Sequence, residues 1–336
     1  MSSVERRSIE KSTRQAAVAS HGRVLHQEPA HSRPCITILL CTLNGARFLA
    51  AQLASIEQQS YDNWRLIASD DHSDDATLAI LRHFAHRVCQ PVEIRMGPQR
   101  GPAANFLSLA ADPGIDGDYF AFCDQDDVWH RDKLARAMSW VAAMPPDLPT
   151  IYGGRTQVVC AAGRPLGYSH RFVRPPSFGN SLVQSIAGAN TMLFNRAAKR
   201  LLEEAGQVEV TAHDWWAYQL VSGCGGVVGY DPAPQIDYRQ HGQNRIGSNR
   251  GLRAQLRRIV MVCHGRFSAW NEVNLAALRG ARHLLTDEAR ALIDVFEVMR
   301  KGSLTARLRA FALSPLRRQT SLGNVALLIA AAFKKL

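Results

Sequence analysis

Short apolar runs alternate with longer amphipathic stretches along the first half of the chain. Four runs have the length of a strand: Cys35–Cys41, Trp64–Ala68, Val92–Met96 and Tyr119–Cys123. The first and the last are almost continuously apolar, which is typical of parallel strands covered on both faces. Apolar residues at helical spacing lie between the runs, over Phe48–Gln58, Thr77–Val88 and 103–111. This alternation predicts an α/β fold with helices beside a parallel sheet.

The second half of the chain is less regular. Further strands are expected over Ile151–Cys160 and Gly226–Tyr230, and the pattern becomes helical from Leu252 onward. The chain is therefore predicted to have three parts. These are a disordered polar extension over residues 1–33, a catalytic domain over residues 34–250 and a basic helical region over residues 251–336.

The net charge of +11 belongs entirely to the last quarter of the chain. Residues 1–249 carry 24 basic and 24 acidic side chains, whereas residues 250–336 carry 16 and 5. Such an excess favours an anionic partner, which is either nucleic acid or an anionic membrane surface, and a solvated basic helix face is the simpler alternative. No segment reaches the ~18 apolar residues that cross a bilayer. Any membrane association is therefore expected at the surface.

The seven cysteines form no C-x-x-C pair, and several lie within apolar runs. They are typical of reduced, buried thiols rather than of a disulfide framework or a zinc site. Because the N-terminal residues also lack the apolar core of a secretory signal, a cytoplasmic location is expected.

Polar turns follow the four predicted strands of the first half. The side chains of interest after the first, second and fourth strands are Thr42, Asn44, Asp71, Asp124, Gln125, Asp126 and Asp127. Ligands of parallel sheets bind beyond the carboxyl ends of the strands, so these turns are expected to meet in one site.

Asp124 and Asp126 form a D-x-D pair directly after an apolar strand. Alternate residues of an extended chain point the same way, so the two carboxylates can converge on one cation. Mg²⁺ and Mn²⁺ prefer such oxygen ligands, and their charge offsets the repulsion between the acids. The chain has no P-loop, no H-E-x-x-H and no G-x-G-x-x-G after the first strand. The acidic turn at Asp71 also lacks the Gly and Glu of an EF-hand.

Three segments resemble motifs of the family 2 glycosyltransferases of the GT-A fold. They read CITILLCTLNGARFLAAQLASIEQQSYDNWRLIASDDHSDD, MGPQRGPAANF and DQDDVW. The last is especially similar to the turn of bacterial rhamnosyltransferases, and the resemblance covers roughly Pro34 to Arg245. It implies a GT-A fold, which is a Rossmann-like mixed sheet of nucleotide-diphospho-sugar transferases flanked by helices.

The same resemblance implies an inverting, metal-dependent glycosyltransferase with Mg²⁺ or Mn²⁺ as cofactor. The donor would be a nucleotide-diphosphate sugar, either dTDP-rhamnose or a UDP-sugar. The acceptor would be a polysaccharide or lipid-linked glycan of the cell surface. With the basic tail, this places the protein at the cytoplasmic face of the membrane, with no nucleic acid as partner.

Residue roles follow from the resemblance alone. The nucleoside pocket would contain Thr42, Asn44 and Asp71, and the rest of the donor would contact Asn105, Asp124 and Gln125. The metal would bind Asp126, and His241 would contact the metal or the diphosphate. Asn190 would lie on the acceptor side.

Transfer also needs a general base for the acceptor hydroxyl. The candidate is Asp214 in the segment Thr211–Trp216, which reads TAHDWW. The alternative is that Asp214 only caps a helix, because an acid is favoured at a helix N-terminus. His213 is expected to orient this base, and Trp215 is expected to stack on a sugar at the acceptor side.

Two other functions compete with this one. A nucleotidyltransferase also needs carboxylates for Mg²⁺, but the turn Thr42–Arg47 lacks the Gly-rich, Lys-bearing pattern that grips a triphosphate. A non-catalytic nucleotide-sugar binding protein would not need Asp124, Asp126 and Asp214 together.

Overall fold

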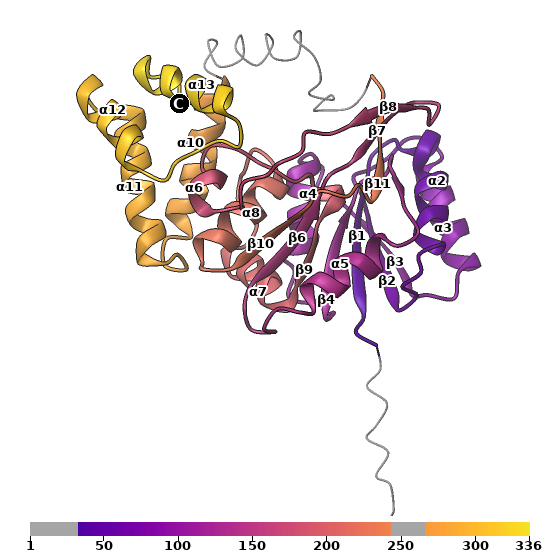
Figure 1. Cartoon of the computed structure of the whole chain (residues 1–336). Coiled ribbons are helices and arrows are strands. Elements are labelled where there is room, and N and C mark those ends of the chain that lie inside the picture. The colour runs from indigo at the N-terminus through magenta and orange to yellow at the C-terminus, as the bar shows by residue number, and fades with distance from the viewer. Residues whose placement is uncertain (1–32, 243–265) are drawn as a thin grey trace, which may run out of the picture. The chain divides into compact units, whose positions relative to one another are not determined.

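The structure is a computed structural model that describes residues 33–242 and 266–336 (Figure 1). Residues Pro34–Leu336 form one compact unit. The predicted extension over residues 1–33, apart from its last residue, and the predicted boundary at residue 250 lie outside the described residues.

A mixed seven-stranded sheet crosses the described part of the chain in the order β10-β6-β9-β4-β1-β2-β3. Its strands are β1 (Ile36–Thr42), β2 (Trp64–Asp70), β3 (Val92–Met96), β4 (Tyr119–Cys123), β6 (Thr150–Gly154), β9 (Leu193–Asn195) and β10 (Val227–Asp231). β1 pairs in parallel with β2 and β4, and β2 pairs in parallel with β3. Only β9 runs antiparallel to its neighbours, β4 and β6. The predicted mixed sheet with mainly parallel strands is confirmed.

A smaller sheet has the order β5-β11-β7-β8. Its strands are β5 (Val128–Trp129), β7 (Gln157–Cys160), β8 (Pro165–Tyr168) and β11 (Ile236–Gln240). The single strand expected over Ile151–Cys160 is wrong, because the chain leaves the large sheet after Gly154 and enters the small one at Gln157. β5 and β11 pair antiparallel, which brings the segment after the D-x-D turn next to the segment that ends at His241.

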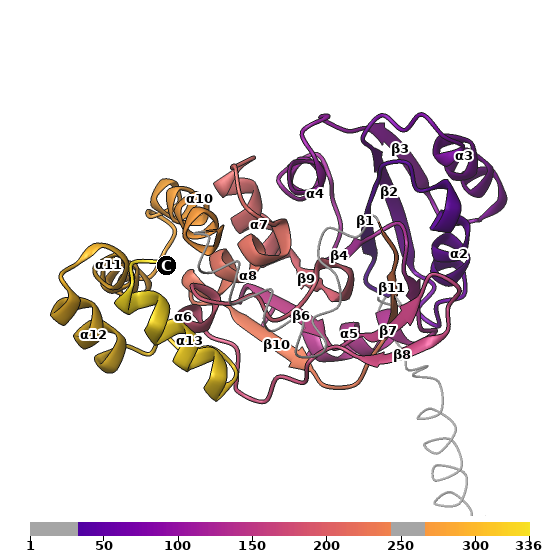
Figure 2. The same cartoon turned by 90° about the horizontal axis from the view of Figure 1, so that it is seen from above.

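Helices flank the large sheet (Figures 1 and 2). Those of the first part are α2 (Ala46–Glu57), α3 (Thr77–Arg87), α4 (Pro102–Ala110), α5 (Lys133–Val141), α6 (Phe178–Ser181), the 3-10 turn η1 (Ala189–Thr191), α7 (Arg196–Ala205) and α8 (His213–Gly223). The later ones are α10 (Arg266–Gly280), α11 (Asp287–Lys301), α12 (Leu304–Leu313) and α13 (Ser321–Ala332).

Two hydrophobic clusters cover the two faces of the sheet. Alternate residues of β1 enter opposite clusters, since Ile38 and Leu40 belong to one and Leu39 and Cys41 to the other. This follows from the period of two in a strand and explains why the run is apolar throughout. One cluster includes residues of α2, α3 and α5, and the other includes residues of α4, α7 and α8.

The second cluster continues into the C-terminal helices. Leu278, Phe296 and Leu327 from α10, α11 and α13 are buried in the same cluster as Trp216 of α8. The basic helical region therefore shares its core with the sheet. Within the described ranges, no helix has both the length and the hydropathy that a bilayer span requires.

Candidate active site

The turns after β1 and β2 are joined by hydrogen bonds centred on Asp70. The Thr42 hydroxyl donates to Asp70 Oδ1 at 2.7 Å, and the Ser73 N–H donates to Oδ2 at 2.8 Å. The Asp71 N–H donates to the Thr42 carbonyl at 2.8 Å. Asp70 is fully buried, and its position as the last residue of a strand is the only sequence signal that could have identified it.

Asn44 connects the same two turns from the other side. Its N–H donates to the Ser73 hydroxyl at 2.8 Å, and its side-chain Oδ1 accepts from the Asp74 N–H at 3.0 Å. Its φ of 49° lies in the left-handed region, which asparagine tolerates better than most residues. Thr42, Asn44 and Asp71, which were predicted to line one pocket, are thus brought together.

Gly97 separates Asp71 from Asn105. A Cβ at Gly97 would lie 2.7 Å from Asp71 Oδ1 and 2.8 Å from Asn105 Oδ1, so only glycine fits between them. Asn105 is buried, accepts from the Ser69 hydroxyl at 2.5 Å and donates to the Ser69 carbonyl at 3.1 Å. These bonds hold α4 against β2, and the donor contact expected of Asn105 stays a prediction.

Gln125 joins the turn after β4 to the turn after β1. Its side chain accepts from the Leu43 N–H and donates to the Leu43 carbonyl, both at 2.9 Å. A Cβ at Gly45 would lie 2.2 Å from Gln125 Oε1, so this paired hydrogen bond depends on the glycine. Gln125 was predicted to contact the donor, and that contact stays a prediction. In the structure its side chain connects the two turns.

The two predicted metal ligands contact each other. His241 Nε2 lies 2.7 Å from Asp126 Oδ2, and the His241 ring lies 4.7 Å from that of Phe48. β11 delivers His241 to this place because it pairs with β5. In the described residues, no group of three or more His, Cys, Asp and Glu side chains is arranged to hold a metal on its own.

Asp127 is fully buried beside this pair. It accepts from the Arg239 N–H at 3.2 Å and from the Asn190 side-chain amide. Arg239 Nε also donates to the Asp126 carbonyl at 3.0 Å. Asp127 and Arg239 therefore fix the turn, a role that sequence reasoning missed for both. The extra acid in DQDD was the signal for Asp127.

Asp124 lies where the charges of the site meet. Burial raises the pKa of its carboxyl well above its usual range, and the charges of Asp127, Asp126 and Asp214 raise it further. Burial and the charge of Asp126 raise the pKa of Asp127 as well, against the hydrogen bonds from Asn190 and Arg239. The site thus concentrates negative charge that a cation would neutralise.

Asp214 opens α8 and faces the same cluster of acids. Burial raises its pKa to about 6, although hydrogen bonds from the backbone of Trp215 and Ala189 act in the opposite direction. Ala189 and Asn190 are neighbours in η1, so this short turn holds both Asp214 and Asp127. A carboxyl that titrates near neutral pH suits a general base better than a helix cap alone.

His213 and Trp215 have core environments. The His213 ring stacks 3.9 Å from the Phe106 ring, and burial lowers its pKa to about 3, so the imidazole is neutral. Its Nε2 has no hydrogen-bond partner among the described residues. Trp215 is buried, and its Nε1 donates to the Ser181 carbonyl at 2.6 Å. These contacts do not support the expected role of His213 in orienting the base or that of Trp215 in stacking on a sugar, and both roles stay predictions.

One buried lysine was not anticipated. Lys133 of α5 is fully buried with its Nζ 3.6 Å from the centre of the Trp129 ring, and burial lowers its pKa to about 7. The charge of Asp127 acts on it in the opposite direction. No pattern in the sequence distinguishes this lysine from a surface one.

The chain is similar to known glycosyltransferases. Residues 37–178 match the model of glycosyl transferase family 2. The dTDP-rhamnosyl transferase RfbG of Shigella flexneri is 26% identical over 234 residues, which are 66% of this chain and 78% of that protein. The putative teichuronic acid biosynthesis glycosyltransferase TuaG of Bacillus subtilis is 24% identical over 181 residues, which are 53% of this chain and 66% of that protein.

Among solved structures, residues 1–349 of S. aureus TarS in complex with UDP-GlcNAc give a TM-score of 0.51 at 13% identity. The similarity covers 88% of this chain and 89% of that one, and at this identity it shows the fold alone. The family match spans β1 to β4 and the D-x-D turn, where the acids of the site gather. The predicted GT-A fold and glycosyltransferase activity are thereby confirmed, and residues 37–178 form a domain that matches glycosyl transferase family 2.

Proposed function

We propose that this protein is an inverting, metal-dependent rhamnosyltransferase of glycosyltransferase family 2. The observation that carries the proposal is the meeting of Asp214, with its raised pKa, and the acids of the D-x-D turn in one site. One group is thus available to take a proton from the acceptor, and another to bind the charged end of the donor. A non-catalytic binding protein requires no group that takes a proton, and the turn Thr42–Arg47 lacks the Gly-rich, Lys-bearing pattern with which a nucleotidyltransferase grips a triphosphate.

The donor set suits a hard divalent cation. Asp124 and Asp126 offer carboxylate oxygens, and the burial that raises the pKa of Asp124 would be offset by a positive charge. Mg²⁺ is commonly held by one or two carboxylates together with substrate phosphates, which agrees with so few protein ligands. When bound, Mg²⁺ or Mn²⁺ would offset the charge of the departing diphosphate.

The reaction needs the protein to accept one proton from the acceptor hydroxyl. As the acceptor oxygen forms a bond to the anomeric carbon, Asp214 takes the hydroxyl proton. The bond from that carbon to the diphosphate breaks with its electron pair on the leaving oxygen. Thr42, Asn44 and Asp71 would hold the nucleoside, with Gln125 fixing the turn between them and the D-x-D.

The sugar, the acceptor and the location are also proposed. The similarity to the dTDP-rhamnosyl transferase RfbG and the DQDDVW turn favour dTDP-rhamnose, and a UDP-sugar is the alternative donor. A polysaccharide or lipid-linked glycan acceptor agrees with the name of TuaG. The basic C-terminal region favours action at the cytoplasmic face of an anionic membrane.

The test of the proposal is Asp214→Asn, a change that keeps the size of the side chain but removes the base. We expect kcat to fall by about 10² to 10⁴, with the Kd of the donor within about threefold of wild type. The wild-type kcat should also decline below pH 6, because protonated Asp214 accepts no proton.

Donor turnover is measured with a panel of nucleotide sugars in Mg²⁺ or Mn²⁺, before and after chelation. Full activity of Asp214→Asn would show that Asp214 is not the base. Full activity in excess chelator would show that the reaction does not depend on a metal. Turnover of a UDP-sugar but not of dTDP-rhamnose would reassign the donor and leave both roles intact.

A further inference from the structure

α13 is apolar on two opposite sides, although protein covers only one of them. Leu327, Ala330 and Ala331 are buried in the core. The uncovered side exposes Leu322, Val325, Ile329 and Phe333. Their spacing of three or four residues puts these four side chains in one stripe along the helix. A helix with no polar face is expected to have an apolar environment on both sides.

α12, which packs against α13, extends the apolar surface with Leu304, Leu308 and, at its end, Leu313. We call these seven residues of α12 and α13 the docking face. They make up more than half of the large apolar side chains that are exposed in the described part of the chain. Exposed apolar residues are ordinary when scattered, but such a concentration on two neighbouring helices marks an interaction surface.

The segment that carries the docking face has charged side chains of one sign only. Residues 303–336 contain six arginine and lysine side chains and no acidic residue. Lys334 and Lys335 follow directly after Phe333, which is 72% exposed. Apolar side chains bordered by cations are the composition of a helix that lies at the surface of an anionic membrane.

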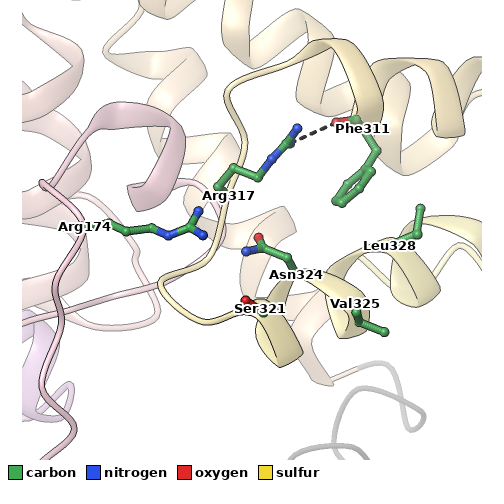
Figure 3. Close-up of a pocket in the computed structure, with 7 residues that line it drawn as sticks. All are labelled: Arg174, Phe311, Arg317, Ser321, Asn324, Val325 and Leu328. Carbon is green, nitrogen blue, oxygen red and sulfur yellow. Dashed lines mark hydrogen bonds between the residues drawn. The ribbon is translucent and has the colours of Figure 1, made fainter.

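A pocket opens beside the docking face (Figure 3). It has a volume of ≈ 340 Å³, and its lining combines the guanidinium groups of Arg174 and Arg317 with Phe311, Val325 and Leu328. Figure 3 shows the Arg174 side chain extending toward Asn324, while the Arg317 guanidinium is directed at the Phe311 carbonyl, to which its Nη1 donates at 3.0 Å. Gln319 holds this arrangement together, because it accepts from the Arg174 N–H and donates to the Arg174 carbonyl, both at 3.0 Å.

We propose that the docking face binds the surface of an anionic phospholipid bilayer. The stripe of α13 and the leucines of α12 would enter the boundary between headgroups and acyl chains. Arg174 would pair with lipid phosphate, for which a guanidinium group is well suited, while Arg317 donates to the Phe311 and Leu316 carbonyls and fixes the end of α12 beside it. The inference deepens the proposed function, since it gives a residue-level basis for transfer to an acceptor carried by the membrane.

A second copy of the chain is a poorer occupant of the same surface. Two docking faces placed together would bring like charges into a medium of low dielectric constant, which is unfavourable. An anionic bilayer instead supplies opposite charge and an apolar layer at once.

The experiment is flotation of the full-length protein with vesicles of phosphatidylcholine alone or with 30 mol% phosphatidylglycerol, on the order of the anionic content that attracts basic segments. We expect binding to the anionic vesicles only, weakened at least tenfold in 1 M salt. Ile329→Gln combined with Phe333→Gln should lower the partition coefficient by about tenfold or more.

Leu166→Gln is the matched control, because Leu166 on β8 is 54% exposed and Ile329 is 53% exposed. This control should float like the wild type. Absence of wild-type flotation, or equal flotation of the Ile329/Phe333 variant, would overturn the proposal. A dimer that this variant abolishes, without any flotation, would assign the face to a second copy instead. Flotation uses neither donor nor acceptor, so its failure is distinct from failure of the transferase assay.

Discussion

At the scale of single residues, two glycines hold the donor side of the site together. Neither is required for an unusual backbone angle, since Gly45 has a φ of −95°. Each instead leaves room for a polar side chain from another turn, Gln125 at Gly45 and Asp71 with Asn105 at Gly97. The site therefore depends on the absence of atoms at these two positions as much as on the functional groups around them.

Gly45→Ala should act through Gln125. The new Cβ displaces Oε1 and breaks the paired hydrogen bond to Leu43, so we expect the KM for the donor to rise about five- to tenfold. Gln125→Ala should have a similar effect, and the double variant should be no worse than either single one. Steady-state kinetics of the four proteins give the coupling energy, and additive effects would show that the two residues act independently.

Sequence patterns identified the acids that the structure brings together, but they did not identify the residues that surround these acids. These acids can be recognised from short sequence patterns, namely D-x-D after an apolar strand, the D-D-x-S-D-D turn and the segment that contains Asp214. Asp70 and Arg239 gain their roles from contacts across 28 and 112 residues of sequence, and Lys133 is distinguished only by its burial. His213 and Trp215, the neighbours of Asp214 in the sequence, pack in the core, which a linear pattern does not indicate.

At the scale of elements, η1 links the two halves of the active site. Ala189 of this short turn donates a backbone hydrogen bond to Asp214, the proposed base. The next residue, Asn190, donates to Asp127 of the D-x-D turn. The strand pattern predicted β1 to β4 and β10 because each of these segments is a short run rich in apolar residues, whereas the three-residue β9 was not predicted. It gave neither the break between β6 and β7 nor β11, whose polar residues only become a strand by pairing with β5 and β7.

Asn190→Ala should separate the contribution of η1 from general stability. It removes a hydrogen bond to a buried carboxylate, which should raise the pKa of Asp127 further and lower kcat about tenfold. The KM for the donor should change less than threefold, because the nucleoside turns do not contact η1 through this bond. A lower melting temperature with unchanged kcat and pH profile would mean that Asn190 is only structural.

At the scale of the whole molecule, the C-terminal helices are part of the enzyme's core. Composition predicted them as a separate basic region, and the charge of residues 250–336 supports that description of the surface. Burial shows a different property, since Leu316, Leu327 and Ala331 are almost fully enclosed in the cluster that also covers the sheet. The charge pattern of a sequence indicates which residues face solvent. It does not indicate which apolar side chains pack against another element.

A chain that ends after Gly302 should therefore be unstable. The loss of two buried leucines alone removes about 3 to 6 kcal/mol of hydrophobic burial, before the newly exposed partners are counted. Urea unfolding followed by tryptophan fluorescence should show a lower midpoint than for the full chain. An unchanged midpoint would mean that α12 and α13 are an appendage that the sheet does not need.

The gathered carboxylates also determine how the protein is best handled. Asp124, Asp127 and Asp214 all have pKa values that burial raises in the folded state above those of the unfolded chain, near 4. Such groups bind protons more tightly when folded, so they favour folding at low pH, and this advantage is lost as the pH rises through the raised values. In the absence of a cation, a mildly acidic buffer near pH 5 to 6 should protect the enzyme better than pH 8, and Asp214→Asn should narrow the difference.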